Sequence, residues 1–189
     1  MQVMKLKIPL TLWLVLLALV TQIRGVPITW PQILTDVGDY PDTNTGPLLT
    51  DLNNGLSPDT TGPNGWTAVH LAAGLNKPKM AAILKIKGVD LNIQDSDSYT
   101  PLHIAAGHGS PDVIGSLYPV ANTEIKGPNQ WTPLHVAAGN GFSSCVTTLI
   151  FESANINAAE SHGWTPLHIA VGNGYNIIVF TLLTFITTT

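Results

Sequence analysis

One four-residue motif recurs along the chain at a nearly constant interval, and this repetition limits the possible folds more than any other feature. Three copies read Thr-Pro-Leu-His, starting at Thr100, Thr132 and Thr165, and an earlier copy reads Thr-Ala-Val-His from Thr67. The histidines that end these copies are 33, 32 and 33 residues apart. Such an interval predicts a repeat protein, in which each unit is one supersecondary motif stacked on its neighbours.

Each unit is predicted to contain two short helices and a polar turn. Threonine followed by proline favours a helix start, because the hydroxyl can cap the helix and proline fits its first position. The pair Ala105 and Ala106 gives a slim helix face that lets neighbouring helices approach closely. Glycines predict the end of this first helix at Gly107, Gly139 and Gly172. A unit of this size has too little apolar surface to fold alone, so its stability must come from stacking.

The repeat resembles the ankyrin-repeat family, whose signature is this period with the pattern Thr-Pro-Leu-His-x-Ala. The resemblance implies an all-α solenoid of helix-turn-helix units with short β-hairpin fingers, and places unit starts near residues 65, 98, 130 and 163. It also implies that the recurrent histidine is structural and hydrogen-bonds into the adjoining turn. These histidines are His70, His103, His135 and His168.

Residues 1–25 differ in character from the repeats. Two lysines precede an apolar run over residues 8–20, and the small residue Gly25 follows shortly after it. A basic start, a short apolar run and a small-residue exit predict a secretory signal peptide, with cleavage after Gly25 or, as the alternative, after Thr21. We therefore expect a secreted protein. The alternatives are retention in the secretory pathway and membrane anchoring through an uncleaved signal.

Residues 26–64 are interpreted as a degenerate N-terminal unit or as a proline-rich leader. The first interpretation rests on the segment from Gly55 to Thr67, which has the same length as the segment from Gly88 to Thr100. The second rests on the six prolines of residues 26–64, because proline-rich polar stretches often stay unfolded. The repeat domain itself is assigned to residues 65–189.

The charge distribution excludes one class of partner and favours another. Without the signal peptide the chain has five lysines against twelve acidic residues, a net charge of −7. Nucleic-acid binding needs a basic face, and only Lys126 is basic after residue 88. We expect an acidic surface that binds a protein, one with a basic surface being favoured.

The sequence predicts neither an enzyme nor a cofactor or metal site. No nucleophile-elbow or phosphate-binding motif occurs. Recurrent histidines one repeat step apart are separated by roughly 10 Å, whereas metal ligands lie about 2.1 Å from a shared ion. The single cysteine, Cys145, is expected to be a small buried core residue, with an intermolecular disulfide as the alternative.

The strongest functional candidate is a ladder of aromatic residues directly before the helix-starting threonines. It consists of Trp66, Tyr99, Trp131 and Trp164. The family resemblance places this position on the concave side at the base of the fingers, where ankyrin partners are commonly contacted. Trp and Tyr dominate interface hot spots, although the same rings could instead pack on the adjacent turn. The neighbouring partner-binding candidates are Asp95, Asp97, His108, Asn129, Asn140, His162 and Asn173.

The last predicted helix is apolar on nearly all sides. Ile177 and Phe180 occupy positions where the family normally carries Glu and Lys facing water. Such an apolar end face usually marks an interaction site, which makes self-association through the C-terminal unit an expectation.

Three functions follow from these features. The first is an extracellular or secretory-lumen protein–protein interaction scaffold, which binds through the fingers and the concave helix face. The second is a secreted toxin or host-directed effector, because the repeats alone also resemble the long ankyrin arrays of spider neurotoxins. The third is a structural subunit that assembles through its C-terminal face.

Overall fold

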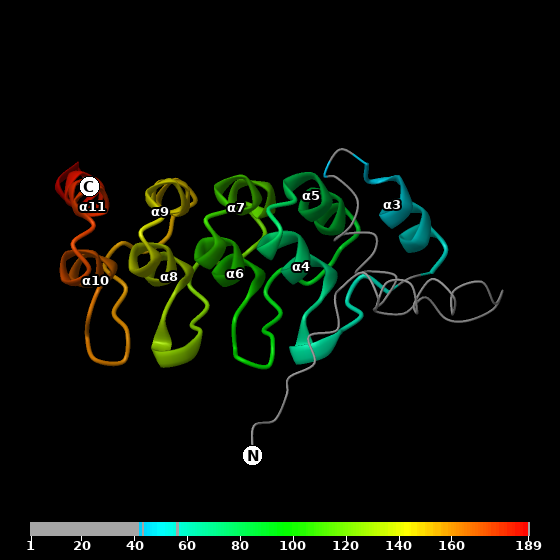
Figure 1. Ribbon diagram of the computed structural model, residues 1–189, viewed down its shortest axis with the longest axis horizontal. Coiled ribbons are helices and arrows are strands. Elements are labelled where there is room, and N and C mark those ends of the chain that lie inside the picture. Colours follow the sequence, from blue (N-terminus) through cyan, green and yellow to red (C-terminus); the bar gives the residue numbers. More distant parts are fainter. Residues whose placement is uncertain (1–41, 43, 56, 189) are drawn as a thin grey trace, which may run out of the picture.

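The chain folds into a row of stacked helix pairs (Figure 1). The computed structural model describes residues 42, 44–55 and 57–188, so the predicted signal peptide lies outside the described residues. The α-helices within this range are α3 (Gly46–Asn53), α4 (Ala68–Gly74), α5 (Pro78–Ile86), α6 (Pro101–His108), α7 (Pro111–Leu117), α8 (Pro133–Asn140), α9 (Ser143–Phe151), α10 (Pro166–Gly172) and α11 (Asn176–Thr188). The 3₁₀ turns η2 (Pro63–Gly65) and η3 (Pro128–Gln130) lie in the fingers.

The helices form two parallel rows (Figure 1). Helices α4, α6, α8 and α10 make the inner row, and α5, α7, α9 and α11 make the outer row. The loops between pairs project from the inner row as fingers, and α3 lies at the N-terminal end of the stack. Helices α4 to α11 pack both on their own partner and on the corresponding helices of the adjacent units. This arrangement confirms the predicted all-α solenoid.

The recurrent motif builds the start of each inner helix. Thr100 is extended and precedes Pro101, which occupies the first turn of α6. The Thr100 hydroxyl accepts a hydrogen bond from the backbone N–H of His103, and the His103 ring accepts one from the backbone N–H of Thr100. This reciprocal capping box satisfies backbone donors that a helix start leaves unpaired. The same pairing occurs at Thr67, Thr132 and Thr165.

The inner row of helices contributes small apolar side chains to the core, and the outer row contributes larger branched ones. The inner helices contribute alanines that are completely buried, namely Ala72, Ala105, Ala137 and Ala170. The outer helices contribute one completely buried leucine each, namely Leu84, Leu117, Leu149 and Leu182. Alanine lets the inner helices approach closely, while leucine fills the wider space between the outer ones. One continuous core therefore runs along the stack.

An end was predicted for three of the four inner helices, and two of these predictions are wrong. Helices α6 and α8 continue beyond Gly107 and Gly139. They end where Gly109 and Gly141 adopt φ values of +69° and +81°. Only this left-handed conformation lets the chain turn into the next helix, so the conformational demand falls on the second glycine of each pair. Helix α10 does end at Gly172, as predicted.

The fingers are tight turns rather than β-hairpins. The described residues contain no strand. The Asp95 N–H donates to the Tyr99 carbonyl at 2.9 Å, and this bond closes the finger. The Ser96 N–H donates to the Asn64 carbonyl at 2.8 Å and links this finger to the preceding one. Fingers of this length hold too few residues for a ladder of backbone pairs.

Helix α3 extends the stack towards the N-terminus. Its residue Leu48 is completely buried in the common core. Upstream of it, the Asp42 carboxylate accepts hydrogen bonds from the backbone N–H groups of Lys79 and Met80 at 2.9 and 3.1 Å. Asp42 therefore caps the start of α5 from a distant part of the chain. Residues 26–41 lie outside the described range, and the choice between a degenerate unit and a leader stays a prediction.

Candidate protein-binding surface

The inner-row histidines connect one unit to the next. The Nε2 atoms of His70, His103 and His135 lie 3.1, 3.0 and 3.2 Å from carbonyl oxygens of the following unit. Those carbonyls belong to the aromatic ladder residues of that unit. His168 is exposed, and among the described residues it bonds only to Thr165 in its own turn.

The three linking histidines are neutral side chains. Desolvation by burial lowers the pKa of His70, His103 and His135 below the ordinary value of 6.5, although the bonded carbonyls and nearby carboxylates oppose the shift. Their ring nitrogens are already occupied by backbone partners. No group of three or more His, Cys, Asp or Glu side chains within the described part of the chain could hold a metal ion.

The aromatic ladder lies against the inner row of helices. Trp66, Tyr99 and Trp131 are partly buried against the core, whereas Trp164 is 54% exposed. The Trp66, Trp131 and Trp164 rings each lie against a glycine near the end of their own inner helix. A Cβ atom added to Gly139 would approach the Trp131 ring to 3.0 Å, and one added to Gly74 would approach the Trp66 ring to 3.5 Å. The glycine at this position therefore makes room for the ring.

The two interpretations of the ladder each apply to part of it. The partly buried rings contact the histidines of their own units. The Trp66 ring stacks on His70 with the centroids 6.2 Å apart, the Trp131 ring is tilted against His135 at 6.1 Å, and the Tyr99 ring meets His103 edge-on at 5.7 Å. This is the packing role. The rings also leave one edge or face at the surface, most of all at Trp164.

Asp95 requires a correction, because it does not face a partner. It is only 8% exposed. Its carboxylate accepts hydrogen bonds from the backbone N–H groups of Tyr99 and Asp97 at 2.8 and 3.0 Å and from the Trp66 indole N–H at 3.1 Å. Asp95 is thus the residue that holds the finger closed and anchors the indole of the preceding unit.

The other partner-binding candidates are exposed and form two groups. Asp97, Asn129 and His162 lie on the fingers, whereas His108, Asn140 and Asn173 lie at the C-terminal ends of the inner helices. The tryptophan rings run from the finger base to the last turn of the inner helix, and so lie between these groups. An aromatic strip with polar margins has the composition of a protein interface.

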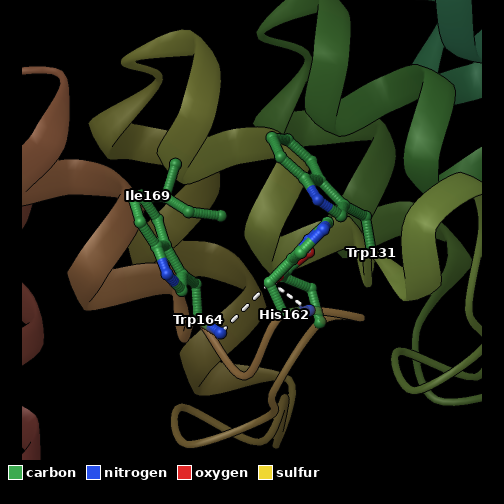
Figure 2. Close-up of a pocket in the computed structure, with 5 residues that line it drawn as sticks. Trp131, His162, Trp164 and Ile169 are labelled. Atoms are coloured by element: carbon green, nitrogen blue, oxygen red, sulfur yellow. Dashed lines mark hydrogen bonds and ion pairs between the residues drawn. The ribbon is translucent and has the colours of Figure 1, made fainter.

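A small pocket opens between the last two fingers. Its volume is about 280 Å³, and it is lined by Trp131, Glu160, His162, Trp164 and Ile169. Figure 2 shows the indoles of Trp131 and Trp164 on opposite sides, with His162 between them. The repeat pattern does not predict this pocket, and it indicates that Glu160 is a solvated turn residue or part of an acidic binding edge.

The structure contains a second aromatic pair that was not predicted. Phe142 and Tyr175 occupy the same register in successive units and pack on the left-handed glycines of the preceding unit. A Cβ atom at Gly109 would lie 2.7 Å from the Phe142 ring, and one at Gly141 would lie 3.0 Å from the Tyr175 ring. The spacing of Phe142 and Tyr175, which equals one repeat, could have predicted this pair.

The C-terminal helix exposes apolar side chains. Ile177 and Phe180 are 72% and 73% exposed, whereas Ile178 on the other side of α11 is buried.

Cys145 is completely buried, and desolvation raises the pKa of its thiol to about 11. A thiol of this kind is unreactive. Among the described residues, no helix combines the length and the apolar character that crossing a membrane requires.

Stacked helix pairs, tight fingers and a histidine that joins successive units define a helical repeat solenoid. The family model for ankyrin repeats in three copies matches residues 42–126 and 115–187, so the chain belongs to the ankyrin-repeat family. The match begins before the first intact motif and includes α3. Proteins of this family are generally interaction modules rather than enzymes.

Curated relatives share the repeat over part of their length. The chain is 36% identical over 63 residues to an ankyrin repeat-containing protein of Schizosaccharomyces pombe, covering 33% of this chain and 30% of that protein. It is 43% identical over 51 residues to a BTB/POZ domain and ankyrin repeat-containing protein of Oryza sativa subsp. japonica, covering 26% and 9%. It is 39% identical over 58 residues to protein phosphatase 1 regulatory subunit 27 of Mus musculus, covering 31% and 38%. The matches thus span well under half of each relative.

Proposed function

We propose that the protein is a secreted scaffold that binds a protein partner through its fingers and the concave face of its inner helices. The observation that carries this proposal is the aromatic strip between two margins of exposed polar residues. Large rings with few rotatable bonds lose little conformational entropy on binding, which is why such residues dominate interface energetics.

The charge of the surface supports a partner with a basic surface. From residue 89 onward the chain has one basic residue, Lys126, against seven acidic ones. Asp97, at the tip of its finger, is exposed, and so is Glu124 in a loop of the next unit. Complementary charge steers association and disfavours acidic competitors more than it raises affinity.

Substitution of two ladder residues tests the binding face. Trp131→Ala and Tyr99→Ala should each weaken binding to a partner captured from secreted fluid by about 1–3 kcal/mol. Ile86→Ala is the matched control, because Ile86 is an exposed apolar residue on the outer row. Circular dichroism gives the folded fraction of each variant. Unchanged affinity per folded molecule, together with a lower melting temperature, would assign the ladder to packing alone.

Export is supported by the basic start and the apolar run over residues 8–20. N-terminal sequencing of protein recovered from the culture medium should find Val26 as the first residue. Cell-retained protein that still begins at Met1 would contradict the secreted assignment.

Self-assembly through α11 is a second candidate function. It is favoured by the exposed side chains of Ile177 and Phe180 and by the absence of Asp, Glu, Lys and Arg after Glu160. Leaving two such side chains in water forgoes roughly 2–3 kcal/mol each relative to full burial. The double change Ile177→Glu and Phe180→Lys should give a folded monomer from an associating parent, as measured by light scattering and thermal melting. A parent that is already monomeric at tens of micromolar would exclude this function.

A further inference from the structure

Two equivalent junctions between fingers differ in how the tryptophan and the acidic residue are arranged. At the first junction, the Trp66 indole N–H donates to Asp95 at 3.1 Å. At the last junction, the residues in the corresponding positions are Trp131 and Glu160. No hydrogen-bond partner for the Trp131 indole N–H is found among the described residues. Within the described part of the chain, the last junction therefore leaves the Trp131 indole N–H unpaired beside the pocket, whereas the first junction pairs the Trp66 indole N–H with Asp95.

The acidic side chain explains this difference. The Glu160 carboxylate turns back into its own finger, where one oxygen accepts hydrogen bonds from the backbone N–H groups of His162 and Trp164 at 2.7 and 3.2 Å. The other oxygen accepts from the Ser161 hydroxyl at 3.1 Å and lies 3.2 Å from His162 Nδ1. Asp95 closes its finger with one oxygen in the same way, so the two junctions differ in the second oxygen, which bonds to the Trp66 indole at the first junction and to Ser161 at the last. The finger thereby holds a fixed carboxylate at the pocket wall.

The fixed carboxylate is charged throughout the physiological pH range. Desolvation acts to raise its pKa, but the hydrogen bonds from His162, Trp164 and Ser161 prevail and lower the pKa of Glu160 to about 2. A positive charge lies close to this finger, because the Lys126 ammonium donates to the carbonyl of Ala159, the residue before Glu160, at 2.9 Å. His162 is the other titratable group at the pocket, and its side chain is 80% exposed.

Shape and charge together specify the occupant. The pocket volume of about 280 Å³ lies at the lower limit of small-molecule sites, which suits one long side chain. Its walls are two indoles that face each other across the opening (Figure 2). Indole faces attract cations, and a planar guanidinium is less strongly hydrated than an ammonium and stacks well on aromatic rings.

We propose that Trp131, Trp164 and Glu160 form a socket for one arginine side chain of the protein partner. The guanidinium stacks against the indoles beside the exposed His162 side chain, within the field of the Glu160 carboxylate, and a backbone carbonyl of the same segment accepts from the Trp131 indole N–H. This proposal rests on the proposed binding function and specifies the chemistry of the partner at one point of the interface.

Short capped peptides provide the probe: Gly-Arg-Gly, its lysine analogue and its citrulline analogue, which has nearly the shape of arginine without the charge. The full chain is titrated while the indole N–H resonances are followed by NMR. We expect saturable shifts of the Trp131 and Trp164 resonances with the arginine peptide, and binding about tenfold weaker with the citrulline peptide. Equal binding of the lysine or citrulline peptide would overturn the assignment.

Two variants separate the socket from general attraction to an acidic surface. Glu160→Gln should weaken arginine-peptide binding about tenfold, whereas Asp97→Asn removes the same charge from an exposed position on another finger and should leave it unchanged. Trp164→Ala should abolish the saturable shift of Trp131, and because Trp164 is 54% exposed the fold should persist. Equal losses in the Glu160 and Asp97 variants would overturn the proposal.

Failure of the socket is distinguishable from failure of the binding function. Partner capture that survives Trp164→Ala at full affinity but is lost in Tyr99→Ala would overturn the socket and leave the scaffold function standing. Loss of capture in Trp164→Ala, together with loss of the arginine-peptide shifts, would support both.

Discussion

The Nε2 atom of His103 lies 3.0 Å from the carbonyl oxygen of Trp131, so a single imidazole joins two successive units. A carbonyl can only accept, which assigns the ring proton to Nε2. The Nδ1 atom then has a lone pair for the backbone N–H of Thr100, 3.2 Å away. The neutral ring satisfies both partners at once. A second proton on Nδ1 would face the Thr100 donor and break the capping box.

Acid should therefore destabilise the stack in a defined pH window. Burial lowers the folded-state pKa of His70, His103 and His135 below 6.5, while the unfolded chain keeps ordinary values. The stability is fully present above pH 6.5 and is lost as the pH falls towards the folded-state values, by up to about 1.4 kcal/mol per pH unit for each histidine. Urea unfolding at pH 7.5 and 5.5 measures the loss.

The exposed His108 supplies the control for the pH dependence. His108→Asn should retain the full acid loss. The contribution of Glu160 lies outside this window, because a pKa lowered to about 2 affects stability only below its unfolded value near 4.5. Equal stability at pH 7.5 and 5.5 would contradict the assignment of the histidines as neutral links.

Loss of one linking imidazole should cost far more than loss of the terminal one. His103→Ala leaves the Trp131 carbonyl and the Thr100 N–H without their partner, at about 1–3 kcal/mol for each buried group. His168→Ala removes only the local bonds with Thr165 in an exposed turn and should cost under about 1 kcal/mol. Chemical denaturation of both variants compares them. Equal costs would show that the link between units contributes nothing.

Replacement of two acidic residues in one finger by alanine should change stability by very different amounts. Asp95→Ala removes a buried carboxylate that accepts three hydrogen bonds, and should lower stability by about 2–4 kcal/mol. Asp97→Ala changes an exposed side chain and should stay within about 0.5 kcal/mol of the parent. Thermal melting distinguishes them, and a similar loss in both would remove Asp95 from its role as the finger anchor.

Alanine should be harmful at one glycine and helpful at another only six residues away. Gly109 has φ +69°, and an added Cβ atom would lie 2.7 Å from the Phe142 ring, so Gly109→Ala should destabilise by roughly 1–2 kcal/mol or more. Gly115 lies within α7, with nothing within 4 Å of an added Cβ atom. Gly115→Ala should stabilise by about 0.5–1 kcal/mol. Denaturation midpoints test both signs, and a stabilising Gly109→Ala would disprove the left-handed cap.

The repeat interval was sufficient to predict the solenoid, because each unit carries the same helix start and the same buried positions. It could not separate Asp95 from Asp97, since the buried position of Asp95 depends on the indole of Trp66, 29 residues away. It also placed the helix ends at Gly107 and Gly139, because sequence alone does not distinguish a glycine inside the last helical turn from the left-handed glycine that ends the helix. The pocket was missed because it depends on rings from two units, Trp131 and Trp164, and on the contacts of the Glu160 side chain within its finger.

The segment after Glu160 contains no Asp, Glu, Lys or Arg, and this gives the apolar surface of α11 and the acidic finger at Glu160 opposite responses to salt. Added sulfate strengthens apolar contacts by exclusion from the protein surface, so any association through α11 would tighten as the salt concentration rises. Screening shortens the reach of exposed charges to about 8 Å at physiological ionic strength, so a contact that depends on Glu160 would loosen under the same conditions. A rise in ionic strength would thus favour association through α11 over a contact that depends on Glu160.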